Sequence, residues 1–363
     1  MNKHIFYIAA ACAALASCVK NEVRVNAPDK EITFQTVSTK AGGAAFETNK
    51  HFFSYAYFLE KGKSWDDADL DLDKEAKPYI DKAVITYDHG TTQGQGHWVA
   101  ANSYYWPKQG SLTFFAWTDN TIHDPANNPA PSVGTGATVS CAPNTGIKIE
   151  NYSVKGNPNK DILVAEIAKD KRQNESVTEP GRDWDNGVPT VFRHALANVE
   201  FNVNKREDYK NVKFRVREIT LNNVFTKGTF TQGSPTESWG WSAQTEPDGL
   251  SVFKGDKEVN TTATKLNPNS TSGATDYFIV LPQNFDNDTP TLTIKYEIIT
   301  SYVAGKQPVT ETVTETKALN TIYPDNWKIG KKYVLGITLG LNEIFWDPSI
   351  VDWATINVPG IEI

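Results

Sequence analysis

The densest group of chemically active side chains is an acidic stretch at residues 66–73, which contains five aspartates. Clustered carboxylates suit Ca²⁺, but a calcium loop also needs a glycine at its tight turn and a glutamate at its end. Lys74 stands where the EF-hand glycine would be, and Ile80 stands where the terminal glutamate would be. The pattern therefore favours a solvated acidic loop or short helix over a metal site.

Other catalytic signatures are missing from the sequence. The chain has six histidines, and none is spaced from a second ligand as in a zinc site. It contains no Walker loop, no Gly-x-Ser-x-Gly elbow, no His-Glu-x-x-His and no Cys-x-x-Cys. We therefore predict no cofactor, no metal and no enzymatic activity. A glycoside hydrolase with two carboxylates is the weakest alternative, because no local motif identifies the pair.

One cysteine has a predicted chemical role. Lys3, the apolar residues 5–15 and the quartet Leu15-Ala16-Ser17-Cys18 form a secretion signal that is too short to span a bilayer. The quartet resembles a bacterial lipobox, in which small side chains fit the signal peptidase and the thiol takes the lipid. We predict that residues 1–18 hold the signal peptide with its lipobox and that Cys18 is lipidated, for example with palmitate. More than one acyl chain makes such an anchor stable.

Composition indicates a soluble all-β body without disulfides. The formal charge of −7 over 363 residues argues against nucleic acid as a partner. Cys12 lies in the leader and Cys18 is the predicted lipid site, which leaves only Cys141 in the mature chain. The many aromatic, Thr and Val residues, punctuated by Gly and Pro, are typical of β-sheets.

Short strands with turn signals recur in both halves of the chain. The predicted strands include residues 52–59, 83–87, 111–117, 147–154, 161–167, 199–203, 212–216, 224–230, 277–282, 292–298, 310–316 and 333–339. We expect residues 310–316 to form an edge or exposed strand, because neither of its faces is strongly apolar. The polar, aperiodic stretch 169–189 marks a domain boundary. These observations predict two tandem antiparallel β-sandwich domains at residues 41–175 and 190–363.

Several motifs together resemble those of one family, the fimbrillin-like proteins of the type V pili of Bacteroidia. They are Tyr104-Tyr-Trp-Pro107, Leu112-Thr-Phe-Phe-Ala-Trp117, Asp161-Ile-Leu-Val-Ala165, Phe192-Arg-His-Ala-Leu-Ala-Asn-Val199, Tyr277-Phe-Ile-Val-Leu-Pro-Gln283, Ile344-Phe-Trp-Asp-Pro348 and Val351-Asp-Trp353. The resemblance spans nearly the whole chain and keeps the family's order.

The resemblance implies two transthyretin-like sandwiches exported to the outer membrane as a lipoprotein. A surface trypsin-like protease would then remove the lipidated N-terminus together with its first strand. The groove left behind would accept a strand from a neighbouring subunit, which is donor-strand exchange. The partners implied are other copies of the chain or other fimbrial subunits, with a host or glycan ligand for adhesion.

The family's cleavage position matches Lys40-Ala41, where a basic residue follows an alternating strand and precedes small, Gly-rich sequence. Residues 19–40 would then be a propeptide, and Ile32 and Phe34 would fill the groove before cleavage. Arg24 is a rival site, but a cut there would leave Ile32 in place. A plain surface loop at residues 38–45 is the alternative.

The donor strand is expected within residues 350–363. Ile350, Ala354, Ile356 and Val358 share one parity, although Asp352 interrupts it and a Pro-Gly pair limits the strand. The tail could equally be the last strand of its own sandwich.

Two other functions stay open from the sequence. The chain could be the anchor or the tip of the same pilus instead of its stalk. It could also be a glycan-binding surface lipoprotein that uses tryptophans as a stacking platform. The candidate tryptophans are Trp65, Trp98, Trp106, Trp184, Trp239 and Trp241, of which the Trp239-Gly240-Trp241 segment is expected to be exposed.

Overall fold

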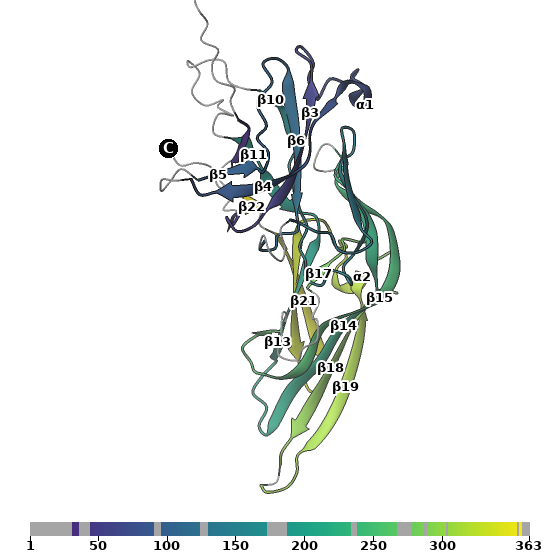
Figure 1. The fold of residues 1–363 in the computed structure, drawn as a ribbon. Coiled ribbons are helices and arrows are strands. Elements are labelled where there is room, and N and C mark those ends of the chain that lie inside the picture. Colours follow the sequence, from purple (N-terminus) through teal and green to yellow (C-terminus); the bar gives the residue numbers. More distant parts are fainter. Residues whose placement is uncertain are drawn as a thin grey trace, which may run out of the picture.

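The computed structural model describes residues 31–35, 44–90, 96–123, 130–172, 187–233, 238–266, 278–286, 289–302, 304–353 and 356–357. Within these ranges the chain is almost entirely β-structure. The two helices have four residues each, α1 at Leu72–Glu75 and α2 at Leu319–Ile322. The molecule is elongated, with one group of strands at each end of its long axis (Figure 1).

The upper group is an eleven-stranded sheet in the order β11-β1-β5-β4-β3-β6-β9-β12-β22-β2, with β10 paired to β6. Its strands are β1 Thr33–Gln35, β2 Ala44–Ala45, β3 Phe52–Leu59, β4 Lys77–Asp88, β5 His97–Ala100, β6 Ser111–Thr118, β9 Leu163–Ala165, β10 Ala168–Lys171, β11 Val188–Pro189, β12 Val191–His194 and β22 Ile356–Asn357.

Two further sheets complete the described fold, and the six-stranded one extends from the lower group to the upper group along β14 (Figure 1). The five-stranded sheet has the order β16-β13-β20-β21, with β17 paired to β13, and the six-stranded sheet has the order β19-β18-β14-β8-β7, with β15 paired to β14. Their strands are β7 Thr138–Ala142, β8 Gly146–Ser153, β13 Ala197–Lys205, β14 Val212–Thr231, β15 Gly240–Val259, β16 Thr264–Lys265, β17 Ile279–Val280, β18 Thr291–Thr300, β19 Val309–Ala318, β20 Lys331–Leu339 and β21 Ile344–Asp352.

The upper sheet curls round a core of its own. β11 and β12 are far apart in the order of the sheet, yet only Thr190 separates them along the chain. This single-residue connection brings β11, at one end of the sheet order, next to β12, near the other end. The enclosed core contains Phe34, Phe52, Trp98 and Phe114, all buried. The strands therefore wrap around aromatic side chains instead of forming a flat layer.

A long pair of strands joins the two ends of the molecule. β14 pairs with β18 over Val212–Asn222 and with β8 over Lys227–Thr231, while β15 runs alongside it. Figure 1 shows β14 and β15 passing from the lower group towards the upper group. A second, larger core lies between the sheets and includes Phe115 from the upper sheet and Phe230 from β14. The upper half is therefore closed by strands from both halves of the sequence.

The all-β fold class and most of the expected strands are confirmed. The predicted edge strand 310–316 is β19, at the end of its sheet. The boundary between residues 175 and 190 lies largely outside the described residues. The division into domains 41–175 and 190–363 stays a prediction, because β8 pairs across it with β14.

Candidate functional site

The first described strand, β1, lies between β5 and β11 in the upper sheet. It runs antiparallel to β5, where Phe34 lies opposite Trp98, and parallel to β11, where Phe34 lies opposite Val188. The backbone N–H of Ile32 donates to the carbonyl of Tyr104 at 2.7 Å. Since β1 has only three residues, it forms few backbone hydrogen bonds with either neighbouring strand.

The side chains of β1 and its flank reach into the aromatic core. Ile32 and Phe34 are each 2% exposed. The Phe34 ring meets Phe52 edge-on at a centroid distance of 5.5 Å and Phe114 at 6.0 Å. The two residues predicted to fill a groove therefore lie in the core that the upper sheet encloses.

Gly187 lets β11 approach β1 closely. Its φ is +113°, and a Cβ placed there would lie 2.7 Å from the carbonyl carbon of Phe34. Such a distance is too short for a carbon contact, so only glycine fits without moving one of the strands. Gly187 was not identified from the sequence, because the strand that follows it has only two residues and shows no period.

The predicted cleavage and lipid sites lie outside the described residues. This holds for Lys40, Ala41, Cys18 and the rival Arg24. The strands on either side of the cleavage position are informative, however. β1 lies between β5 and β11, whereas β2 pairs with β22 at the other end of the sheet order. A cut within residues 36–43 would therefore separate β1 covalently from every other strand.

The residues predicted for the donor strand fall in two different sheets. Ile350 belongs to β21, lies opposite Tyr333 and is 42% exposed. Ile356 belongs to β22 and pairs with Phe192 of the upper sheet. Ala354 and Val358 lie outside the described residues. The tail thus leaves the lower sheet after β21 and returns to the upper sheet, and it is not one continuous strand.

A ring stack marks the point where the tail crosses. Trp353 follows β21 and lies parallel to His194 of β12, with ring centroids 3.6 Å apart. The backbone N–H of Trp353 donates to the carbonyl of Gly330 at 2.9 Å. His194 is itself 2.8 Å from Asp161 through its Nδ1 atom. The stack fixes the start of the tail against the upper sheet.

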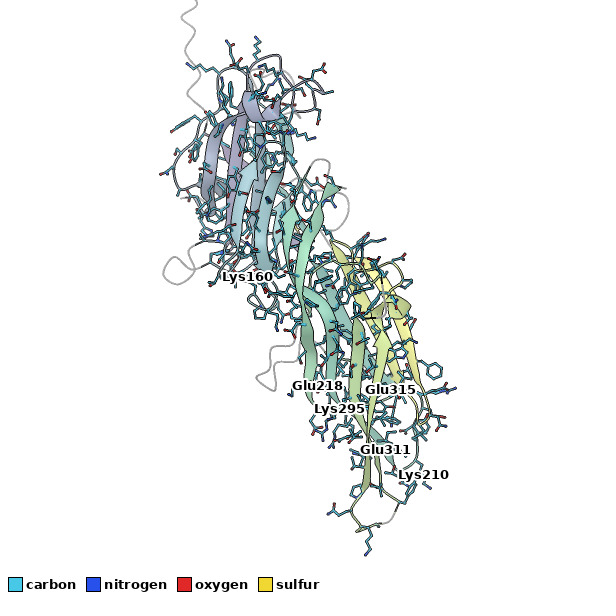
Figure 2. The ribbon with its side chains drawn as sticks, turned by 90° about the vertical axis from the view of Figure 1, so that its right-hand side faces the viewer. Lys160, Lys210, Glu218, Lys295, Glu311 and Glu315 are labelled. Carbon is cyan, nitrogen blue, oxygen red and sulfur yellow. The ribbon has the colours of Figure 1, made fainter. Side chains whose placement is uncertain are left out.

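A buried carboxylate lies near the middle of the long axis, where Figure 2 places Lys160. Asp119 Oδ2 is 3.2 Å from Lys160 Nζ, and Asp119 Oδ1 is 3.1 Å from Nε2 of His123. Burial by itself would raise the pKa of Asp119, but the hydrogen bonds from His123 and from the backbone N–H of Ser132, together with the charge of Lys160, lower it to about 2. These contacts tie down the loop after β6.

The candidate tryptophans within the described ranges do not form an exposed platform. Trp65, Trp98 and Trp106 are buried. The expectation that Trp239 and Trp241 are exposed is wrong, because Trp239 is 9% exposed and the Trp241 indole N–H donates to the carbonyl of Ala195 at 2.6 Å. Their rings pack on Phe230 in the larger core. Trp184 lies outside the described residues.

The described part of the chain offers no metal centre and no membrane-spanning helix. It contains no group of three or more His, Cys, Asp or Glu side chains arranged to hold an ion. In the acidic stretch, Asp66 pairs with Lys169 and Asp71 pairs with Lys74, each at 2.6 Å. None of the described helices is long and apolar enough to cross a bilayer.

Comparison with known proteins agrees with the resemblance noted in the sequence. A sequence model of the fimbrillin-like family matches residues 32–353. The chain therefore belongs to the fimbrillin-like family. A search of the curated proteins found no match.

One solved structure of a bacterial fimbrial protein shares the fold, and a second solved structure shows weaker similarity. A fimbrial protein from Bacteroides vulgatus is 18% identical, with a TM-score of 0.63 over 90% of this chain and 100% of that one. A candidate cell adhesion protein from Bacteroides uniformis is 14% identical, with a TM-score of 0.45 over 89% of this chain and 98% of that one. At this identity the first match establishes a common fold.

Proposed function

We propose that this chain is a structural subunit of a cell-surface fimbria that serves adhesion. It is exported as a lipoprotein, held in the outer membrane by Cys18 and cleaved after Lys40 by a surface trypsin-like protease. It then polymerises with copies of itself or with other fimbrial subunits by donor-strand exchange. The observation that carries this proposal is the position of β1, a short strand with buried side chains that one cut would release.

The free energy gained by burying the side chains of β1 is large enough to hold the strand before cleavage and small enough to let another strand replace it afterwards. Burying one Ile or Phe side chain stabilises by about 1.5–3 kcal/mol, so Ile32 and Phe34 together supply roughly 3–6 kcal/mol. A dissociation constant of 1 mM corresponds to about 4 kcal/mol. Once cleavage makes β1 a separate peptide, the described part of that strand binds only weakly. A longer apolar strand can then displace it.

Loss of β1 would leave two kinds of unsatisfied surface. The backbone groups of β5 and β11 that face it would lose their partners, and the space of Phe34 beside Phe52 would be open to water. An extended strand whose alternate side chains are apolar repairs both. Because donor and acceptor are different surfaces, repeated exchange extends into a filament instead of closing a ring.

The C-terminal tail supplies such a strand. Residues after Trp353 include Ile356 and Val358 at alternate positions. β22 makes only two paired positions with β12, whereas β21 is paired with β20 over nine residues. We therefore assign the donor to residues 354–363, with β21 and Ile350 remaining in the subunit that donates.

The N-terminal residue of protein sheared from cells tests the proposal. Ala41 is expected, together with a heat-sensitive ladder of oligomers. Lys40→Gln should retain the lipidated N-terminus and abolish the ladder, while the matched variant Arg24→Gln should mature normally. Sheared protein that is monomeric and still carries acylated Cys18 would overturn the assignment.

A second comparison separates the roles within a pilus. Deleting residues 354–363 should remove the ladder without preventing cleavage at Lys40 if the chain is a stalk subunit. An anchor would keep its uncut N-terminus inside intact pili. A tip subunit would tolerate the deletion, because its tail would not be needed to fill the groove of another subunit.

A further inference from the structure

Lys50 lies between β2 and β3 with its amine directed at a carboxamide. The residue forms an isolated bridge with Ile122, and its side chain is 14% exposed. Its Nζ atom donates to Oδ1 of Asn120 at 3.0 Å and lies 3.3 Å from Glu47. The amine is thus held beside one carboxamide, with a carboxylate able to take its proton.

Asn120 is held in place immediately after β6. Its φ of +53° is the left-handed conformation that asparagine tolerates, and its backbone N–H donates to the Thr118 hydroxyl at 3.2 Å. Its side-chain nitrogen donates to Oδ2 of Asp161 at 3.3 Å. The carboxamide therefore has an amine at its oxygen and a carboxylate at its nitrogen.

Asp161 lies beside the amide nitrogen of Asn120, which would be the departing nitrogen in a substitution at the carboxamide. It is 7% exposed, and its Oδ2 also lies 2.8 Å from His194 Nδ1. Its second oxygen, Oδ1, is buried and makes no hydrogen bond to the described residues. The Trp353 ring covers His194. A buried carboxylate with a free oxygen beside a carboxamide can accept a proton and return it.

From this geometry we propose that Lys50 and Asn120 join through an intramolecular amide cross-link. The neutral Lys50 amine attacks Cγ of Asn120 and forms the new C–N bond. The proton that the attacking nitrogen loses is passed on to the departing nitrogen, and Asp161, which accepts the hydrogen bond of that departing nitrogen, delivers it there. The original C–N bond breaks, and one ammonia leaves for each amide formed. No oxidant or co-reactant is required.

A neighbouring ion pair shows what such a site requires. Lys160 also lies against a side chain of the loop after β6, but its partner is the carboxylate of Asp119 at 3.2 Å. An ionised carboxylate is a poor electrophile, and its partner stays an ammonium ion. Asn120 presents a neutral carboxamide with a leaving group. The same loop thus carries an ion pair and, beside it, a reactive pair.

The cross-link would tie the start of β3 to the end of β6, which are neighbours in the upper sheet. The residues joined are 70 positions apart in the chain. A covalent bond there restricts the unfolded chain and prevents these strands from separating at that end. It does so whether or not the chain polymerises.

Peptide mass spectrometry of the protein purified from cells tests the cross-link. Tryptic digestion should yield one species that joins the peptide containing Lys50, not cut after that residue, to the peptide containing Asn120. Its mass should be about 17 Da, the mass of one ammonia, below the summed masses of these two peptides. Lys50→Arg and Asn120→Ala should each abolish the species. Recovery of both peptides unlinked and at full mass from the wild-type protein would overturn the proposal, without bearing on fimbrial assembly.

Cyclisation of Asn120 to a succinimide also loses one ammonia, so the variants must separate the two reactions. Lys50→Arg removes the mass deficit of a cross-link but leaves that of a succinimide. Lys160→Arg is the matched control and should retain the linked species. Asp161→Asn should leave most of the chain unlinked while its far-UV circular dichroism stays that of the wild type. If a variant fails to fold, the wild-type peptide map still decides.

Discussion

The indole of Trp353 lies parallel to the imidazole of His194, with ring centroids 3.6 Å apart and ring planes 7° apart. This contact joins the end of β21 in the lower half to β12 in the upper half. β22, a few residues further on, pairs with the same strand β12. The stack therefore holds the C-terminal tail at the point where it must pivot if it is to leave.

Trp353→Ala is expected to loosen the tail without unfolding the molecule. An aromatic pair contributes about 1 kcal/mol beyond its burial, so backbone amides of β12 and β22 should exchange roughly fivefold faster. Hydrogen exchange followed by mass spectrometry measures this.

Phe345→Ala serves as the control for the tail, because Phe345 is an exposed aromatic residue of β21 that packs on Arg206. It should leave the exchange of β12 unchanged. Equal effects of the two substitutions would show that the ring stack does not hold the tail.

Phe34→Ala should destabilise the uncleaved chain strongly. Removing a buried Phe side chain costs about 3–5 kcal/mol, because the space beside Phe52 and Phe114 cannot fully collapse. Thr33→Ala, next to it on the less buried face of β1, should change the free energy of unfolding by no more than about 0.5 kcal/mol. Urea denaturation of both variants makes the comparison. If Phe34→Ala were as mild as Thr33→Ala, β1 would not contribute to the core in solution.

Local alternation was enough to predict the main strands. Phe53, Tyr55, Tyr57 and Leu59 share a face in the sequence, and all four lie in the larger core. The other face of the same strand is also buried, since Phe52 packs in the smaller core. The buried apolar density of residues 111–117 likewise corresponds to β6, which is buried along its whole length.

The curled sheet and the path of the tail could not be read from local patterns. β2, β11 and β22 have two residues each, too few to show any period, and exist because distant strands meet there. Trp241 was expected at the surface because its neighbours are Ser and Gly. Its indole instead finds a buried acceptor at Ala195. Of the candidate site, Ile32 and Phe34 were identified from the sequence, whereas Gly187 and Trp353 depend on contacts across the fold.

The buried Asp119 should make stability depend on pH in the acid range. Its folded-state pKa of about 2 lies below the ordinary value of 3.8, so its contribution is present above about pH 4 and is lost as pH falls towards 2. The depression corresponds to roughly 2 kcal/mol.

Asp119→Asn should therefore lower the free energy of unfolding by about that amount at pH 6 and by progressively less between pH 4 and pH 2. Denaturant titrations over this range provide the test. Asp347→Asn, an exposed carboxylate of β21, is the control. A constant difference between Asp119→Asn and the wild type from pH 6 to pH 2 would contradict the assignment.

The edges of the lower sheets carry features that oppose unwanted pairing. β15 has several register shifts against β14 and contains Pro247, and β21 contains Pro348. On β19, Glu311 lies opposite Ile298 and Glu315 lies opposite Ile294. Both isoleucines are buried, so the two glutamates stand on the face of the sheet that carries core residues in β18. Figure 2 shows both glutamates on this outermost strand. Both glutamates are exposed, and charged side chains on an edge strand resist addition of another strand.

Replacing Glu311 and Glu315 together with valine should make the chain associate through β19. The experiment uses the Lys40→Gln background, so that strand exchange at β1 does not contribute. Sedimentation velocity should show concentration-dependent dimers or larger species. The paired variant Thr310→Val with Thr314→Val adds the same β-branched side chains on the opposite face of β19 and should remain monomeric, because the glutamates are retained. Equal association of both double variants would mean that added apolar surface, and not loss of the glutamate charges, drives the pairing.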